Sequence, residues 1–228
     1  MLPYELDLVS TKRFVGQMNQ ILSAYYTSPA INMSSIECSE KAWTNTHAQR
    51  LPYYRSVLFL LHLDHDIRAA TNNRATLRQP VNELLQRQTR GESYGFEDFF
   101  DIVGKYVDRS ATLATFMNMS AGSWLVPPPA LGSTIKAVRR DQWVYDAGYV
   151  TETFDNKVII AKVTPGSNAE RAGCRVGDQL TFGEYRYGAM DDYGRNISMT
   201  LRREEREFMV EYWPRGGEPV ESWQYVVV

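Results

Sequence analysis

Residues 122–132 constrain the fold of this 228-residue chain more than any other segment. The segment contains three consecutive prolines, at 127–129, which lack the backbone N–H that helices and sheets use. Before it, apolar residues recur at the three- and four-residue spacing of helices. After it, short β-branched and aromatic runs are separated by glycines, as in strands joined by turns. The sequence therefore predicts an α+β protein in three parts. These are a helical subdomain at 1–125, a linker at 126–135 and a mainly β domain at 136–228.

Capping signals divide the first part into separate helices. Ser34 and Glu37 have the spacing of a capping box, in which each residue satisfies a backbone N–H of the other. Pro52 is expected to open the next helix, because its missing N–H costs least in a first turn. The expected helices cover residues 11–27, 34–50, 52–70, 76–90, 96–107 and 110–119.

The charge balance argues against two classes of partner. The chain has 25 Lys and Arg against 27 Asp and Glu, a net charge of −2, so it lacks a long-range attraction for nucleic acid or anionic membranes. The longest strongly apolar run, 57–63, spans seven residues, whereas a membrane helix needs about 20. We expect no nucleic-acid or membrane partner. The first residues do not have the pattern of a signal peptide, so a cytoplasmic location is expected.

The two cysteines limit the redox and metal chemistry. Cys38 and Cys174 are 136 residues apart, which excludes a disulfide framework and a cysteine-based zinc motif. We expect both to be buried free thiols, and we expect no metal site and no cofactor.

The most specific motif is VTPGSNAERAGCRVGDQL at 163–180. A strand should end at its Pro-Gly pair, and Ser167 should then cap a short helix that Gly173 ends. Gly177 and Asp178 should make a tight turn into the next strand. This motif resembles that of PDZ domains, which join a strand, a short helix and a second strand in the same way.

The PDZ resemblance implies a peptide-binding site. PDZ domains add an extended peptide to a sheet edge, and backbone N–H groups of the preceding loop receive its carboxylate. In this sequence the matching loop and edge strand begin at residue 146. The implied peptide-binding residues are Ala147, Gly148, Tyr149, Val150 and Thr151. A PDZ fold used only for packing remains an alternative, because Asp146 would repel a carboxylate.

The first part of the chain resembles the glycyl aminopeptidases, a family of zinc metallopeptidases. The resemblance rests on the segments 53–56, 63–68, 76–85 and 95–100, with Ser56 where the family has glycine. It implies the helical half of a thermolysin-like catalytic domain, followed by a PDZ domain. The His-Glu-x-x-His motif that holds zinc in such enzymes is absent from the sequence. The chain therefore resembles the C-terminal half of the family, and zinc aminopeptidase activity is not expected.

Three residues are candidates for chemistry that needs no metal. Tyr53 matches the tyrosine that, in related aminopeptidases, stabilises the oxyanion. His62, His65 and Asp66 have the spacing of one helix face, so His62 and Asp66 could transfer protons. We take Tyr53, His62 and Asp66 as candidate catalytic residues; the alternative is packing or surface roles.

Three functional hypotheses follow. The preferred one is a non-peptidase homologue that binds an extended peptide or a partner's C-terminus through its PDZ-like domain. The second is an enzyme that performs acid/base or cyclisation chemistry on a small molecule in a pocket near Tyr53. The third is a fragment completed by a separate zinc-bearing chain. The expected partners are a peptide, a protein C-terminus or a small molecule, and a homo-oligomer is possible.

Overall fold

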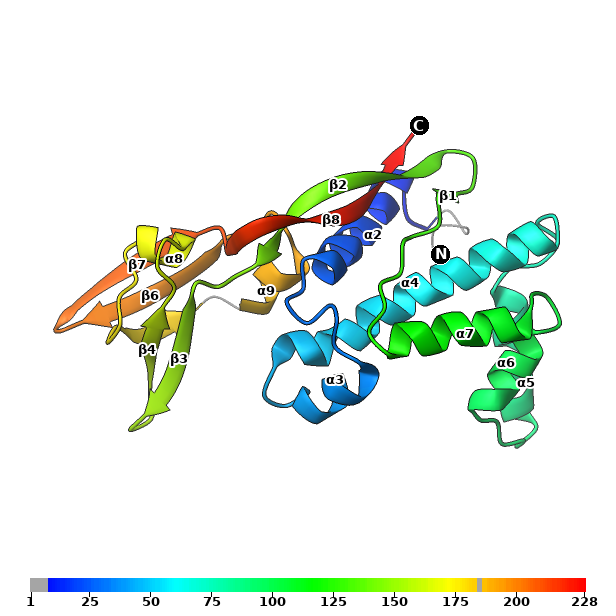
Figure 1. Ribbon diagram of the computed structural model, residues 1–228, viewed down its shortest axis with the longest axis horizontal. Coiled ribbons are helices and arrows are strands. Elements are labelled where there is room, and N and C mark those ends of the chain that lie inside the picture. Colours follow the sequence, from blue (N-terminus) through cyan, green and yellow to red (C-terminus); the bar gives the residue numbers. More distant parts are fainter. Residues whose placement is uncertain (1–7, 184–185) are drawn as a thin grey trace. The chain divides into compact units, whose positions relative to one another are not determined.

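The computed structural model describes residues 8–183 and 186–228. Helices dominate up to residue 120 and strands dominate after it, as Figure 1 shows. The predicted α+β class is confirmed. In the described part of the chain, no helix has both the length and the apolar character needed to cross a membrane.

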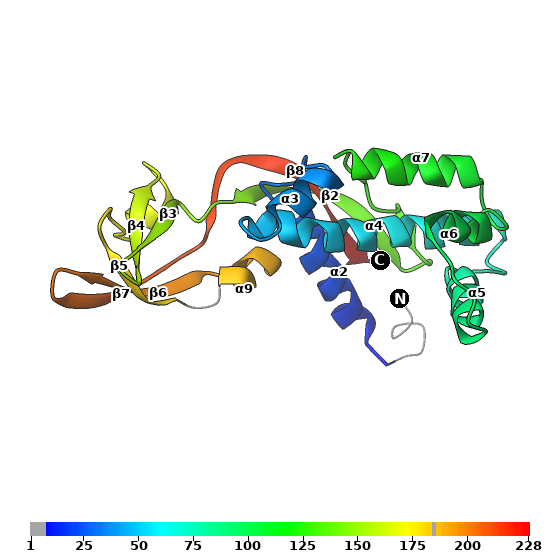
Figure 2. The ribbon, with the colours of Figure 1, turned by 90° about the horizontal axis from the view of Figure 1, so that it is seen from below.

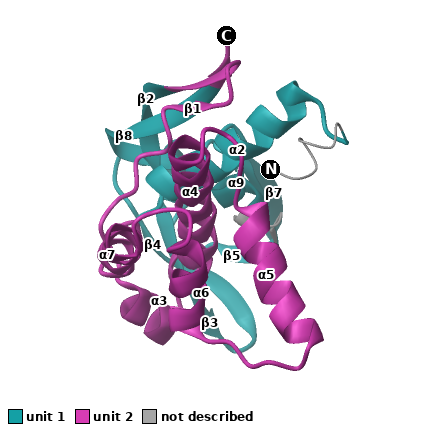
Figure 3. Ribbon diagram, turned by 90° about the vertical axis from the view of Figure 1, so that its right-hand side faces the viewer, with its two compact units in different colours: residues 1–29, 138–225 teal, residues 30–137, 226–228 magenta. Residues whose placement is uncertain are grey.

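The chain forms two compact units, which Figure 3 colours separately. Unit 1 consists of residues 1–29 and 138–225, and unit 2 of residues 30–137 and 226–228. These units differ from the expected domains because the first helix groups with the strands. The predicted domain boundaries at 125 and 135 do not coincide with the limits of these units, and they remain a prediction.

Unit 2 contains most of the helices. They are α3 (Ser35–Lys41), α4 (Thr46–Ala70), α5 (Arg78–Thr89), α6 (Phe96–Val103) and α7 (Arg109–Ser120), and strand β1 (Ala130–Leu131) follows. The capping box at Ser34 and Glu37 forms as expected. The predicted helix start at Pro52 is wrong, because α4 begins at Thr46 and continues through the proline. Asn45 caps α4 instead, accepting from the backbone N–H groups of the next turn.

The core of unit 2 is built on α4. Leu51, Leu58 and Ile67 of this helix are fully buried. Leu51 and Leu58, seven residues apart, share a face, whereas Ile67 is nine residues after Leu58 and lies on the opposite side, so α4 is buried on more than one face. An aromatic cluster packs beside it: the Phe116 ring of α7 lies 5.4 Å from Phe59 and 5.6 Å from Phe100, centroid to centroid. This packing joins α4, α6 and α7 into one body.

Unit 1 contains the five-stranded sheet. Its elements are α2 (Thr11–Tyr26), β2 (Ile135–Tyr145), β3 (Tyr149–Phe154), β4 (Lys157–Val163), α8 (Asn168–Arg171), β5 (Gln179–Gly183), α9 (Arg186–Asp191), β6 (Ile197–Arg203), β7 (Arg206–Tyr212) and β8 (Arg215–Val227). Strands β3 to β7 form one antiparallel sheet in chain order, as Figure 2 also shows. Strands β1, β2 and β8 form a second sheet, in that order.

Helix α2 belongs to unit 1 because its polar side chains bind strands β2 and β8. The Asn19 side chain donates to the carbonyl of Tyr225 at 2.9 Å and accepts from the N–H of Tyr225 at 2.7 Å. Gln142 donates to the hydroxyl of Ser23 at 3.0 Å. These contacts span more than 100 residues of sequence, so no local pattern indicates them.

The motif at 163–180 folds as its residues predict. Ser167 accepts a hydrogen bond from the N–H of Glu170 at 3.2 Å and caps α8. Gly173 and Gly177 take left-handed backbone conformations, with φ of 101° and 92°. Asp178 is 1 % exposed and accepts from the guanidinium of Arg203 at 2.7 and 2.8 Å. The turn into β5 is therefore held by an ion pair between a buried carboxylate and a partly exposed arginine.

Both cysteines are free and buried, as expected. Cys174 belongs to the apolar core of unit 1, beside Ile160 and Ala169. Burial raises the pKa of the Cys174 thiol to about 11, and the nearby Asp178 carboxylate adds to this effect.

Candidate functional site

Strand β3 forms one edge of the five-stranded sheet and pairs with β4 alone among the described strands. The turn between the two strands has two residues, Asp155 and Asn156, whose φ values of 48° and 57° suit a type I′ hairpin. In such a hairpin the flanking pair, Phe154 and Lys157, is hydrogen-bonded, and bonding alternates along the strand. The N–H groups of Thr151 and Thr153 therefore point away from β4. We call this outward side of β3 the β3 edge.

The loop before β3 is held by bonds within the protein. Gly148 donates its N–H to the Asp146 carboxylate at 2.7 Å and accepts from the N–H of Thr164 at 2.8 Å. Its φ is +73°, and a Cβ at this position would lie 2.8 Å from the Ser167 hydroxyl oxygen. Glycine is therefore required here for both backbone conformation and space.

Two further bonds fix the start of this loop. Asp146 donates its N–H to the carbonyl of Pro214 at 3.0 Å. The hydroxyl of Tyr212 donates to the carbonyl of Ala147 at 2.6 Å. Burial raises the pKa of Tyr212, so this hydroxyl keeps its proton and stays a donor.

The five predicted peptide-binding residues divide into two groups. Ala147, Gly148 and Tyr149 are held by the protein's own interior: Gly148 and Tyr149 are buried, and Ala147 packs against the core of unit 1. Val150 is 55 % exposed and Thr151 is half-buried, so both remain accessible on β3. Their role in binding stays a prediction.

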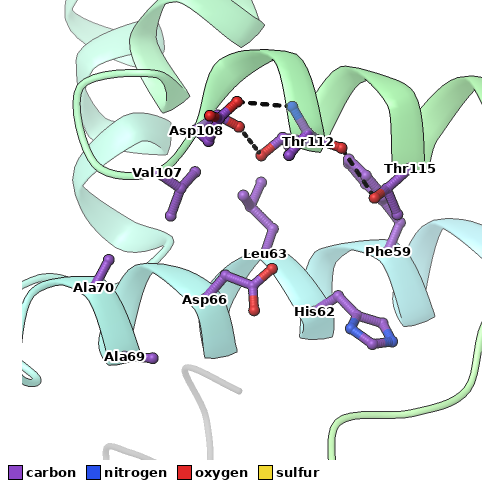
Figure 4. Close-up of a pocket in the computed structure, with 11 residues that line it drawn as sticks. Phe59, His62, Leu63, Asp66, Ala69, Ala70, Val107, Asp108, Thr112 and Thr115 are labelled. Atoms are coloured by element: carbon purple, nitrogen blue, oxygen red, sulfur yellow. Dashed lines mark hydrogen bonds between the residues drawn. The ribbon is translucent and has the colours of Figure 1, made fainter.

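A pocket of about 520 Å³ lies in unit 2 between α4 and the N-terminal part of α7. His62 and Asp66 reach it from α4, while Asp108, Thr112 and Thr115 belong to the α7 side, as Figure 4 shows. Asp108 caps α7 by accepting from the N–H of Ala111 at 2.8 Å. The imidazole Nε2 of His62 contacts the carbonyl of Val126.

Tyr53 lies outside this pocket. It is nine residues before His62 on α4, which is about two and a half helical turns and places the two residues on opposite sides of the helix. Its side chain is 73 % exposed. The structure thus brings His62 and Asp66 together and leaves Tyr53 apart from them. Their catalytic roles stay a prediction.

No arrangement suited to a metal ion is present in residues 8–183 and 186–228: no three His, Cys, Asp or Glu side chains converge there. His65 is half-buried on α4 and is not part of the pocket lining.

Comparison with known proteins adds a fold-level likeness. No family model matches the chain, and no curated protein matches its sequence. Among solved structures, the chain is similar to an aminopeptidase N family protein from Idiomarina loihiensis, with a TM-score of 0.53 and 16 % sequence identity. The chain has an aminopeptidase-like fold. The match covers 99 % of this chain and 44 % of that one, so the chain spans less than half of that protein.

Sequence reasoning missed the α7 wall of the pocket in this aminopeptidase-like fold. The expected helix began at Ser110, but the structure starts α7 at Arg109 with Asp108 as its cap. An aspartate just before a helix is a capping signal that could have been found. That Asp108, Thr112 and Thr115 line the same pocket as His62 could not have been found this way, because about 50 residues separate the two walls.

Sequence reasoning also missed the burial of Arg55. Its side chain is 1 % exposed, and its Nη2 donates to the carbonyl of Ile31 at 2.7 Å. Its Nε and Nη1 have no hydrogen-bond partner among the described residues. Nothing in the structure explains why a charge with two unsatisfied nitrogens is retained there.

Proposed function

We propose that this chain is a peptide-binding relative of the aminopeptidases, which adds an extended polypeptide to the β3 edge as PDZ domains do. One observation carries the proposal: β3 ends the sheet and presents the N–H groups of Thr151 and Thr153 outward. Such N–H groups and the carbonyls between them can pair with an added strand. In this proposal residues 136–228 form the PDZ-like domain, and the relationship is to the C-terminal half of glycyl aminopeptidases.

The side chains of β3 also suit a partner strand. Val150 is 55 % exposed and Phe154 is 78 % exposed, and both lie on the same face of β3 because successive side chains alternate. Exposed apolar side chains at alternate positions give a bound peptide apolar surface to cover, in addition to backbone hydrogen bonds.

The other edge of the sheet, β7, is protected against pairing. Its seven residues include three charged ones, Arg206, Glu207 and Glu211, whereas β3 contains only Glu152. Charged side chains on an edge strand oppose the addition of another strand. The binding edge is therefore β3 rather than β7.

The enzymatic alternative has less support from the geometry. It requires Tyr53, His62 and Asp66 to act in one pocket, and Tyr53 is not among the residues that line it. Peptide binding at the β3 edge is the function that the structure supports best.

The test is selection from two phage-displayed libraries of random peptides, one with free C-termini and one with the peptide inside a longer chain. Thr151→Pro removes an outward N–H without removing a donor to β4. Met209→Pro is the matched control on β7: by the same hairpin argument, its N–H also points outward. Selected peptides should bind the native chain and the Met209→Pro variant, and lose affinity for Thr151→Pro. Failure to select any binder, or equal binding by both variants, contradicts the proposal.

A further inference from the structure

Asp146 occupies the place where a PDZ-like loop would receive a peptide carboxylate. Its carboxylate accepts the N–H of Gly148 at 2.7 Å, and its own N–H is used by the carbonyl of Pro214. The other carboxylate oxygen lies 2.8 Å from where a Cβ on Gly216 would be. The loop therefore already holds one carboxylate, and that carboxylate belongs to the protein.

The charge of Asp146 is not cancelled by an ion pair. No salt bridge to it occurs within residues 8–183 and 186–228. Arg171 and Arg215 line the same surface pocket as Asp146 and keep their positive charges, but both donate their hydrogen bonds to other groups. Arg171 donates to the carbonyl of Gly166 and, at 2.5 Å, to the side chain of Asn168, and Arg215 donates to the carbonyl of Ala189 at 2.8 Å.

A peptide that ended at this loop would bring a second carboxylate beside Asp146. It would meet a like charge, and it would find the N–H groups of Asp146 and Gly148 already bonded. An internal segment brings only neutral backbone to the same place.

We infer, on the basis of the proposed function, that the β3 edge binds an internal extended segment of a polypeptide that continues past the loop, and that it rejects a free C-terminus. The ligand is thus a strand within a longer chain. This differs from the carboxylate recognition that the PDZ resemblance implies.

The test uses the full chain and peptides selected from the two libraries described above. Each selected sequence is synthesised in three forms that end at the same residue: with further residues attached, as a carboxamide, and as a free acid. Binding is measured by fluorescence anisotropy. The extended and amidated forms should bind alike, and the free acid should bind about tenfold more weakly, as expected for one added like charge.

Two variants test whether Asp146 causes this difference. Asp146→Asn keeps an oxygen that can accept from Gly148 but removes the charge, so the free-acid penalty should largely disappear. Asp155→Asn makes the same change in the β3–β4 turn and should keep the penalty. Binders that come only from the free C-terminus library, or free acids that bind as tightly as amides, overturn this inference and leave the proposed function standing. If neither library yields a binder, both this inference and the proposed function are contradicted.

Discussion

Replacement of Gly148 by alanine should destabilise the protein far more than the same replacement at Gly166. Both glycines have left-handed backbones, with φ of +73° and +71°. A Cβ on Gly148 would lie 2.8 Å from the Ser167 hydroxyl oxygen and 2.9 Å from the Ala169 Cβ, whereas nothing lies within 4 Å of a Cβ on Gly166. The two substitutions therefore share a backbone cost and differ in packing.

The expected magnitudes follow from these contacts. A left-handed alanine costs about 1–2 kcal/mol, and the reduced freedom of the unfolded chain offsets about 0.4–1 kcal/mol of that cost. Gly166→Ala should therefore lower the free energy of unfolding by about 1 kcal/mol. The close contacts at Gly148 add about 1–3 kcal/mol of overpacking, so Gly148→Ala should lower it by about 2–4 kcal/mol.

Urea denaturation followed by far-ultraviolet circular dichroism measures both changes, since the midpoint and slope of each curve give the free energy of unfolding. The same samples show whether Gly148→Ala alters the folded spectrum. If the two variants lose the same stability within about 0.5 kcal/mol, the loop does not pack against α8 as described, and the structural requirement for glycine at 148 is refuted.

Three other predictions concern the two cores and their charges. Leu58→Ala removes a fully buried side chain of α4 and should cost about 2–5 kcal/mol in urea denaturation, while Leu60→Ala, at a position 38 % exposed, should cost less than half as much. Cys174 has its pKa raised to about 11, so its alkylation by iodoacetamide in the folded protein should stay slow at pH 8 and increase as the pH approaches 11; rapid labelling at pH 8 would contradict its burial. Asp178→Ala leaves a partly buried arginine without its carboxylate and should cost about 2–3 kcal/mol. Thermal unfolding should show a clear decrease in the melting temperature of Asp178→Ala. It should show almost no decrease for Glu207→Ala, which breaks an exposed ion pair.

Helix boundaries could be predicted where the signal was a local cap. Ser34 with Glu37 formed the capping box that their spacing predicted, and Ser167 capped α8 as expected. Pro52 misled the prediction because proline is only disfavoured inside a helix: the burial of Leu51 and Leu58 on either side maintains α4 through it.

The candidate residues could be named from the sequence, but only His62 and Asp66 could be grouped. His62 and Asp66 are four residues apart, so helical periodicity alone predicted a shared face. The exposure of Tyr53, and the α7 side of the pocket that His62 also lines, depend on how helices distant in sequence pack against one another. No spacing along one helix contains that information.

Much of the local order along this chain therefore followed from the sequence: the caps at Ser34 and Ser167, the glycine turns, the motif at 163–180 and the change from helices to strands after 122–132. These features depend on residues within about four positions of each other, where backbone sterics and hydrogen bonding act directly. The edge position of β3, the grouping of α2 with the sheet and the filled loop before β3 were established by the fold. Each of these depends on partners brought together across tens of residues, as when Pro214 bonds the N–H of Asp146. Long-range packing thus determined which of the recognised residues remain available to a ligand.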